Sequence, residues 1–301
     1  MSGGAGRFVR VDGVPLHVVV EGRGPVCVLA AGLAMAWFDW DPVARLLADR
    51  GRTVVRFDRP GHGLSGPAAE PATAAGEAHR IAALLDALGP VSDPGPVTVV
   101  GHSIAGFHAE AFARLYPERT AAVVLLDSSV EEHPRALLPA ALRTGAARAL
   151  GRAVTAAGLP AALGPAARRL VVRTSRTGGG DPAPQDLVRR CYRTGRVWRG
   201  ALLENSRYPD TAAEVAALRG THPLEAPATV MVGHGGGTGC TARRWLARQE
   251  ALAELLDARF EVAEPSGHLV MLDRPHQVAR AVLEAAARPR GGRTQAGRPL
   301  A

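Results

Sequence analysis

A regular alternation of short apolar runs with longer segments of helical spacing constrains the fold most. The runs at residues 26–30, 53–57 and 97–100 are continuously apolar or nearly so, which is typical of strands buried on both faces. Between them, residues 74–88 carry apolar side chains three and four positions apart and end at a Gly-Pro pair. This alternation predicts an α/β protein whose parallel strands are covered by helices on both faces of the sheet.

The same reading extends along most of the chain. Asp12-Gly13 separates two strand-like segments and is a strong hairpin signal. We expect strands at 8–11, 16–20, 26–30, 53–57, 97–100, 121–126, 229–232 and 260–263. Helices are expected at 40–50, 74–88, 104–116, 241–256 and 276–287. The sheet would therefore have eight strands and be mainly parallel, apart from the opening hairpin.

The alternation is interrupted after residue 126. Residues 131–220 are rich in Ala, Leu and Arg, and we expect short helices there, broken by Pro139, Pro160, Pro165, Pro182 and Pro184. We interpret 131–220 as a helical cap inserted into a core made of 1–130 and 221–288. The tail, 289–301, is expected to be disordered.

Composition excludes several classes of protein. The chain has 301 residues, 47% of them hydrophobic and 21% charged, which is typical of a globular protein. Its longest apolar runs are far shorter than the roughly 20 residues of a membrane helix, and residues 1–10 contain no apolar signal region. We therefore expect no membrane span and a cytoplasmic location. Cys27, Cys191 and Cys240 have no spacing that suggests disulfides or a zinc site.

Positive charge is concentrated in one part of the chain. The net charge is +8, all 36 basic residues are arginines, and residues 131–200 hold thirteen arginines against four carboxylates. Aromatic residues are only 4% and no recognition motif is present, so we expect no nucleic-acid partner. Two interpretations remain open. The arginines either draw anionic substrates to a cleft or simply lie on solvated helix faces.

The sharpest motif is Gly101-His102-Ser103-Ile104-Ala105, which joins an expected strand directly to an expected helix. A serine at such a corner lies on a strained turn with its hydroxyl exposed, and small residues two positions before and after it let the two backbones approach. The Ile104 N–H, at a helix N-terminus, would face a developing oxyanion. An ordinary glycine-containing turn without a catalytic serine could have the same five residues. The rest of the sequence therefore has to distinguish these two interpretations.

With this motif, the chain resembles the α/β-hydrolase superfamily over nearly its whole length outside the cap and tails. Residues 54–65 are similar to that family's strand-four segment and the Gly-rich turn after it. Residues 265–275, Pro-Ser-Gly-His-Leu-Val-Met-Leu-Asp-Arg-Pro, resemble its late histidine loop. The resemblance implies that Ser103 is the nucleophile and His268 the general base, because the family places serine before histidine. We expect no metal ligand set among the ten histidines.

The carboxylate that would complete a catalytic triad with Ser103 and His268 is not at the position usual in the family. The resemblance implies a carboxylate in the loop after the strand at 229–232, but residues 234–239 contain none. A known variant carries the acid after the preceding strand, which here ends at Asp127. A buried carboxylate there could accept the histidine Nδ1–H. Glu131 and Glu132 are weaker alternatives, and Asp127 could instead cap a cap helix.

The resemblance also implies an oxyanion hole. Residues 29–33 are similar to the family's segment after strand three, where a His-Gly pair is usual and the next N–H is a donor. Ala31 replaces that histidine, Gly32 is retained, and the donors would be the N–H groups of Leu33 and Ile104.

These residues predict a cofactor-free serine hydrolase that cleaves an ester, thioester or lactone of a small hydrophobic substrate through an acyl-enzyme. Acyl transfer to another acceptor, or peracid formation as in cofactor-free haloperoxidases, would use the same residues. A non-catalytic binding protein on a hydrolase fold is the alternative from another class. The Gly-rich loop at 233–239 matches neither a dinucleotide fingerprint nor a P-loop, so no nucleotide cofactor is expected. The sequence does not specify an oligomeric state.

Overall fold

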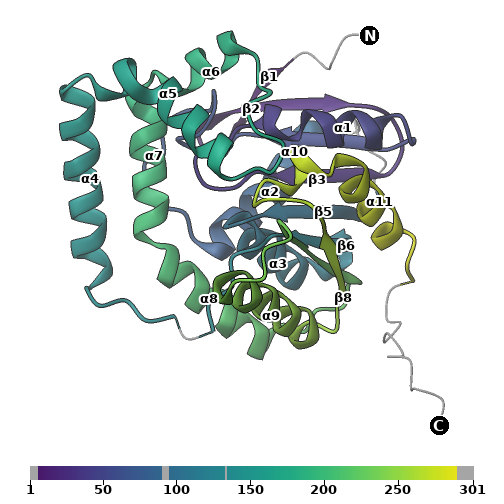
Figure 1. The fold of residues 1–301 in the computed structure, drawn as a ribbon. Helices are drawn as coiled ribbons and strands as arrows, with labels where there is room; N and C mark the ends of the chain where they lie inside the picture. Colours follow the sequence, from purple (N-terminus) through teal and green to yellow (C-terminus); the bar gives the residue numbers. More distant parts are fainter. Residues whose placement is uncertain (1–5, 90–94, 133, 290–301) are drawn as a thin grey trace.

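Eight strands form a single sheet in the computed structural model of the chain (Figure 1). The structure describes residues 6–89, 95–132 and 134–289, and the tail expected to be disordered lies outside these residues apart from residue 289. The strands are β1 Arg7–Val11, β2 Val14–Glu21, β3 Val26–Ala30, β4 Thr53–Phe57, β5 Val97–His102, β6 Thr120–Leu126, β7 Ala228–Gly233 and β8 Arg259–Ala263.

The order of the strands in the sheet is β1-β2-β4-β3-β5-β6-β7-β8. The hairpin partner β1 and the neighbour β4 both pair with β2 in the antiparallel sense, whereas every pair from β4 to β8 is parallel. The mainly parallel eight-stranded sheet expected from the sequence is confirmed. Because the parallel strands share one direction, the loops that follow them meet at one edge of the sheet.

Both faces of the sheet are buried under helices. In β3, Val28 belongs to the apolar cluster under one layer of helices, while Cys27 and Leu29 belong to the cluster under the other layer. The first layer contains α2 Ala74–Leu88, α3 Ala105–Leu115, α8 Tyr208–Thr221 and α9 Cys240–Leu255. The second contains α1 Asp41–Ala48, the short α10 Val270–Asp273 and α11 Pro275–Ala286. Two short 3-10 helices are η1 Trp37–Trp40 and η3 Pro117–Arg119.

Local signals fix the ends of α2 where the sequence predicts them. The Thr73 side chain accepts the Gly76 N–H at 2.9 Å, which caps the first turn. The carboxylate of Glu214 on α8 accepts two further N–H groups from that turn. At the other end, Gly89 has φ +62°, a conformation that glycine adopts readily.

Five helices lie between β6 and β7 in the chain, and the first four of them stand on the left in Figure 1. These four are α4 Ala140–Ala156, α5 Leu159–Thr174, α6 Gln185–Tyr192 and α7 Gly195–Ser206, and α4 packs along α7. The prediction that Pro165 interrupts a helix is wrong, because this proline lies inside α5. Packing of α5 against α6 and α7 outweighs the roughly 3 kcal/mol that an interior proline costs.

The last helix of the segment assigned to the cap packs elsewhere. Helix α8 contacts α2 and α3, and Ala212 and Val215 on α8 belong to the main core cluster. The helices that stand apart from the sheet therefore end at Ser206, and the division of the chain at residues 131–220 remains a prediction. In the described part of the chain, no helix has the length and apolar character needed to cross a membrane.

Candidate active site

Ser103 lies at the sharp corner where β5 ends and α3 begins. Its φ is +55°, a conformation that is strained for a residue with a side chain. Two hydrogen bonds fix the corner: the Ser103 N–H donates to the Leu126 carbonyl at 3.1 Å, and the Ser129 N–H donates to the Ser103 carbonyl at 3.1 Å. A Cβ on Gly101 would lie 2.2 Å from the Ala105 carbonyl oxygen, so only glycine fits two positions before the serine.

His268 and Asp127 meet at the same edge of the sheet. The His268 Nδ1 lies 2.5 Å from the Asp127 Oδ2, and since a carboxylate only accepts, Nδ1 carries the proton. The His268 side chain is 40% exposed and the Asp127 side chain 3% exposed. This contact leaves Nε2 of His268 as the free acceptor, and His268 lines the same cavity as Ser103.

The second carboxylate oxygen of Asp127 is held by two other donors. The Gly233 N–H and the Trp245 Nε1–H, from β7 and α9, each donate to Oδ1 at 3.0 Å. Asp127 itself has φ +40° directly after β6. Its side chain is not a cap of α4, which begins at Ala140.

The two alternative acids lie elsewhere. Glu132 is paired with Arg248 of α9 at 3.4 Å, and in the described part of the chain neither Glu131 nor Glu132 has a hydrogen bond or ion pair with His268.

His102, next to the candidate nucleophile, holds the histidine loop. Its Nε2 donates to the carbonyl oxygen of His268 at 2.9 Å, and the two rings lie 4.6 Å apart between centroids. Burial, together with the proximity of His268, lowers the pKa of His102 well below its usual value. His102 is therefore neutral near pH 7 and positions the backbone of the loop that carries His268.

The loop after β3 is held by the side chains of Arg59 and Tyr192. The Arg59 guanidinium donates to the carbonyl oxygens of Ala31 and Gly32, the second at 3.2 Å. On the other side, the Tyr192 hydroxyl donates to the Ala34 carbonyl at 2.7 Å. Leu33 lies between these anchored carbonyls and lines the cavity beside Ser103. Ile104 follows Ser103, with its side chain buried in the main core.

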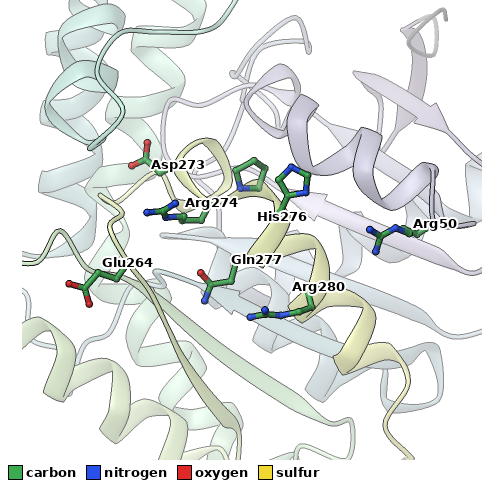
Figure 2. Close-up of a pocket in the computed structure, with 8 residues that line it drawn as sticks. Arg50, Glu264, Asp273, Arg274, His276, Gln277 and Arg280 are labelled. Carbon is green, nitrogen blue, oxygen red and sulfur yellow. The ribbon is translucent and has the colours of Figure 1, made fainter.

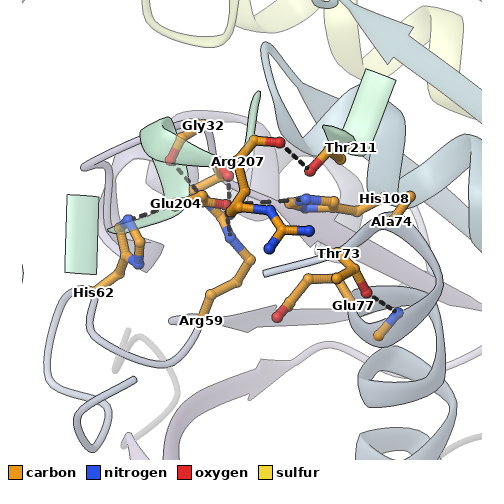
Figure 3. Close-up of polar contacts among 12 residues, drawn as sticks. Gly32, Arg59, His62, Thr73, Ala74, Glu77, His108, Glu204, Arg207 and Thr211 are labelled. Carbon is orange, nitrogen blue, oxygen red and sulfur yellow. Dashed lines mark hydrogen bonds and ion pairs between the residues drawn. The ribbon is translucent and has the colours of Figure 1, made fainter. Parts of the chain in front are cut away.

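A buried charge cluster stands behind this loop (Figure 3). Glu204, on α7, accepts two hydrogen bonds of 3.0 Å from Arg59 and lies 3.0 Å from the Nε2 of His62. Burial alone would raise the pKa of Glu204, but the charge of Arg59 and the contact with His62 hold it well below the usual value. Burial, reinforced by the Arg59 charge, lowers the pKa of the neighbouring His108 to about 4.

Ser103 and His268 open into a cavity of about 580 Å³ between the sheet edge and the cap. Most of its wall is apolar and comes from α5, α7 and the loops after β3 and β8: Leu33, Ala34, Met35, Gly164, Ala167, Val171, Val172, Val197, Trp198, Ala201, Leu202 and Leu269. Asn205, Ser175, Tyr192 and Arg168 add polar atoms. Arg168 is not a free cation, because it is paired with Asp39 and Asp181.

A second cavity, of about 650 Å³, lies beside the start of α11 (Figure 2). Its wall includes Arg274, His276 and Arg280, but neither Ser103 nor His268. Arg280 is already matched to Glu261 and Glu284. We assign no chemistry to this cavity.

Other reactive groups are poorly placed for chemistry. Burial raises the pKa of Cys27 to about 11 and that of Cys191 to about 12, so neither is a thiolate near pH 7. Within residues 6–89, 95–132 and 134–289, no group of three or more His, Cys, Asp or Glu side chains is arranged to hold a metal ion. The aromatic cluster of η1 is buried packing, because Trp37, Phe38 and Trp40 lie outside the cavity wall.

Sequence reasoning missed four residues that support the site: Arg59, Glu204, Tyr192 and Trp245. The His62 side chain, which is 3% exposed, also faces Glu204. Arg59 alone carried a signal, since it lies within the Gly-rich segment compared with the family. Each of the other three needed the three-dimensional contacts.

Comparison with known proteins identifies the family and the fold of the chain. The family model described as "Alpha/beta hydrolase family" matches residues 27–281. The chain belongs to this family. Among solved structures, it is similar to Cfl2 from Burkholderia cenocepacia, with a TM-score of 0.73 and 24% identity over 93% of this chain and 94% of that one. That likeness supports the α/β-hydrolase fold.

Two curated relatives from Mycobacterium tuberculosis match parts of the chain. The chain is 32% identical to Epoxide hydrolase B over 125 residues, 39% of this chain and 34% of the relative. It is 39% identical to Lipase LipV over 119 residues, 39% of this chain and 43% of the relative. The chain thus spans less than half of the length of either relative.

Proposed function

We propose that this α/β-hydrolase is a serine hydrolase that cleaves a carboxylic ester, thioester or lactone through an acyl-enzyme. The observation that carries the proposal is the 2.5 Å contact between His268 and Asp127 beside a serine held at φ +55°. A serine hydroxyl becomes a good nucleophile when a positioned base takes its proton during attack. The three side chains supply a nucleophile, a base and a group that orients the base.

In the first half of the reaction, the Ser103 Oγ attacks the carbonyl carbon and its proton passes to Nε2 of His268. The carbonyl π bond opens to an oxyanion, which the N–H groups of Leu33 and Ile104 stabilise. Asp127 stabilises the imidazolium that forms. Collapse of the intermediate breaks the carbon–oxygen or carbon–sulfur bond to the leaving group, which takes the proton from His268.

In the second half, water attacks the acyl-enzyme carbonyl and gives one proton to Nε2 of His268. The second tetrahedral intermediate collapses, the acid leaves, and Ser103 recovers its proton. The mechanism requires no cofactor, because each proton removed by His268 is returned within the cycle.

The cavity favours a neutral, apolar acyl or alcohol group. Its wall is largely aliphatic and includes Trp198, and its one arginine, Arg168, is neutralised by Asp39 and Asp181. A substrate carboxylate in this cavity would therefore lose hydration without gaining a free cation. We propose a small hydrophobic ester as the substrate class.

The relatives named epoxide hydrolases suggest epoxide hydrolysis as an alternative activity. A serine nucleophile argues against this activity. Attack of Ser103 on an epoxide carbon would form an ether, which contains no carbonyl for water to attack, so the enzyme would remain alkylated. A carboxylate nucleophile would form an ester that water can cleave. A serine at the elbow therefore favours esters over epoxides, as does the match to a lipase.

Labelling with a fluorophosphonate probe tests the proposal, with Ser103→Ala as the variant and Ser129→Ala as the matched control. We expect stoichiometric labelling of the wild type and of Ser129→Ala, and none of Ser103→Ala. An unlabelled but folded wild type would contradict the proposal and favour a non-catalytic binding protein.

Product analysis distinguishes the chemistries that share these residues. A panel of p-nitrophenyl esters of increasing chain length, assayed with water alone, with an added alcohol, and with hydrogen peroxide, should give mainly the free acid. Predominant transfer to the alcohol would indicate an acyltransferase, and predominant peracid would indicate a perhydrolase.

A further inference from the structure

We infer that Glu204 of the cap is a positioning residue for the oxyanion loop, Ala31–Ala34, and acts on it through Arg59. The inference rests on the proposed serine hydrolase function. Glu204 does not line the cavity beside Ser103, whereas its helix neighbours Leu202 and Asn205 do. Any effect of Glu204 on turnover must therefore pass through other groups of the protein.

The peptide group between Gly32 and Leu33 is the part of the oxyanion loop on which Arg59 acts. The Gly32 carbonyl and the Leu33 N–H belong to the same planar amide, so an interaction that fixes the carbonyl also fixes the direction of the N–H. Arg59 Nη2 and the Met35 N–H both donate to this carbonyl, each at 3.2 Å. A cationic donor on the carbonyl also polarises the amide, which makes its N–H a stronger donor to a developing oxyanion.

Glu204 in turn fixes Arg59. The carboxylate accepts from Nε and Nη2 of Arg59, both at 3.0 Å, and each of the two side chains is 4% exposed. The planar guanidinium can make this paired contact in one orientation only, and that orientation aims its remaining N–H groups at the Ala31 and Gly32 carbonyls. Without the carboxylate, the buried cation would be left unpaired at this place.

The other side of the loop is fixed from the cap as well. The Tyr192 hydroxyl donates to the carbonyl of Ala34, a residue with φ +57°. Two cap helices, α6 and α7, thus reach the oxyanion loop from both ends. If the cap only selected substrates, a change at Glu204 would alter KM and leave kcat unchanged.

The test compares Glu204→Gln with Asp210→Asn as a matched control. Both carboxylate oxygens of Asp210 accept from Nη2 of Arg143 on α4, at 2.8 Å and 3.0 Å, and this ion pair does not reach Arg59. Glu204→Gln replaces the carboxylate partner of Arg59, which contacts α7. Asp210→Asn replaces a carboxylate partner of Arg143, which lies on α4. We expect Glu204→Gln to lower kcat by about 10-fold to 100-fold with KM unchanged, and Asp210→Asn to keep kcat within about 2-fold, judged against the larger loss of a whole oxyanion donor.

A trifluoromethyl ketone inhibitor provides a second readout. It forms a hemiketal with Ser103 whose oxyanion occupies the position of the transition state. Its inhibition constant should rise in Glu204→Gln by the same factor by which kcat/KM falls. An unchanged kcat in a folded Glu204→Gln variant, or a change in KM alone, would overturn the inference.

If Glu204→Gln does not fold, the double variant Arg59→Leu with Glu204→Leu removes both charges and should show the same loss of kcat. The amide resonance of Leu33 in a ¹⁵N-labelled sample is a readout that does not depend on turnover. It should shift in Glu204→Gln and not in Asp210→Asn, and an unshifted resonance would overturn the coupling. An unlabelled wild type in the fluorophosphonate assay would contradict the proposed function separately.

Discussion

Asp127 is held by three donors that together occupy both of its carboxylate oxygens. His268 donates to one oxygen, while Gly233 and Trp245 donate to the other. The carboxylate therefore cannot rotate without breaking a hydrogen bond inside the protein. This rigidity fixes the tautomer of His268, with the proton on Nδ1.

We expect Asp127→Asn to lower kcat by roughly 10⁴-fold while the fold is retained, because an amide can present its NH₂ group to Nδ1 and stabilise the wrong tautomer of His268. Ester hydrolysis measured beside thermal unfolding would check this. Turnover close to that of the wild type would move the role to Glu131, Glu132 or a water molecule.

His108 predicts a pH dependence of stability. Burial, followed by the Arg59 charge, lowers its pKa from 6.5 to about 4, and neither ring nitrogen has a hydrogen-bond partner in the described part of the chain. Between pH 6.5 and 4 the unfolded chain binds a proton at His108 that the folded chain does not. The free energy of unfolding should therefore fall as the pH falls through this window, by up to about 1.4 kcal/mol per pH unit from this group.

Urea unfolding of the wild type and of His108→Met at several pH values measures this contribution. The variant should be less sensitive to pH between 4 and 6.5, and should match the wild type in its pH dependence above 6.5. His276→Gln, at an exposed position, is the control. Equal pH dependence in the wild type and His108→Met would contradict the buried neutral state.

Part of the candidate site could be predicted from single residues and their neighbours in the sequence. Ser103 and His268 follow strand signals and precede helix signals, and Asp127 ends an apolar strand while residues 234–239 lack a carboxylate. The pair of Arg59 and Glu204 could not be predicted in this way. Its partners are 145 residues apart, and nothing near Glu204 distinguishes it from a glutamate on a solvated helix face.

At the scale of elements, α9 braces the segment that follows β6. The indole of Trp245 donates to the Asp127 carboxylate at 3.0 Å, and one turn further Arg248 donates to the Val130 carbonyl at 2.8 Å. Gln249 donates to the Ser128 carbonyl at 2.6 Å. Helix α9 thus helps to fix the position of Asp127, the candidate acid.

We expect Trp245→Phe to lower kcat by about 10-fold, since a hydrogen bond to a charged group is worth about 1.5–3 kcal/mol and the Gly233 donor remains. Arg248→Met removes a neighbouring contact on the same helix without touching Asp127, and it should leave kcat nearly unchanged. Equal effects of the two substitutions on kcat would show that α9 acts through general stability alone.

Elements were predictable where a local signal defines both ends. Strand β4 at Thr53–Phe57 and helix α2 at Ala74–Leu88 have the bounds expected from the sequence, because an apolar run marks the first and Thr73 and Gly89 delimit the second. Helix α8 falls within the segment 131–220 that the sequence analysis assigns to the cap, and it packs against α2 and α3 of the core. Helical spacing reports that one face is apolar, but it does not report which neighbour covers that face.

Over the whole molecule, several cap arginines are paired with carboxylates of the core. Arg168 contacts Asp39, and Arg176 contacts Asp273 at 2.9 Å. These pairs attach the cap to η1 and α10 of the core, and they reduce the charge available to attract a ligand. Arg189 and Arg190 on α6 remain exposed.

The exposed pair allows a test of electrostatic steering. If Arg189 and Arg190 attract anionic substrates, kcat/KM for an anionic ester should fall as the salt concentration rises. The reason is that the Debye length shrinks from about 10 Å at 0.1 M to about 3 Å at 1 M. The double variant Arg189→Glu with Arg190→Glu should then penalise that ester and spare a neutral one of similar size. Equal salt responses of the two esters would leave solvation of the helix faces as the role of these arginines.

The buried pair of Arg59 and Glu204 also limits how far the two parts of the chain can be recombined. A foreign cap joined between β6 and β7 would leave the Arg59 guanidinium in the core without its carboxylate unless it carried one at the same place. Such a chimaera would contain an isolated buried cation, a defect that typically costs 3–5 kcal/mol. The cap of this protein is therefore not an interchangeable module, and any exchange has to replace Arg59 together with the inserted helices.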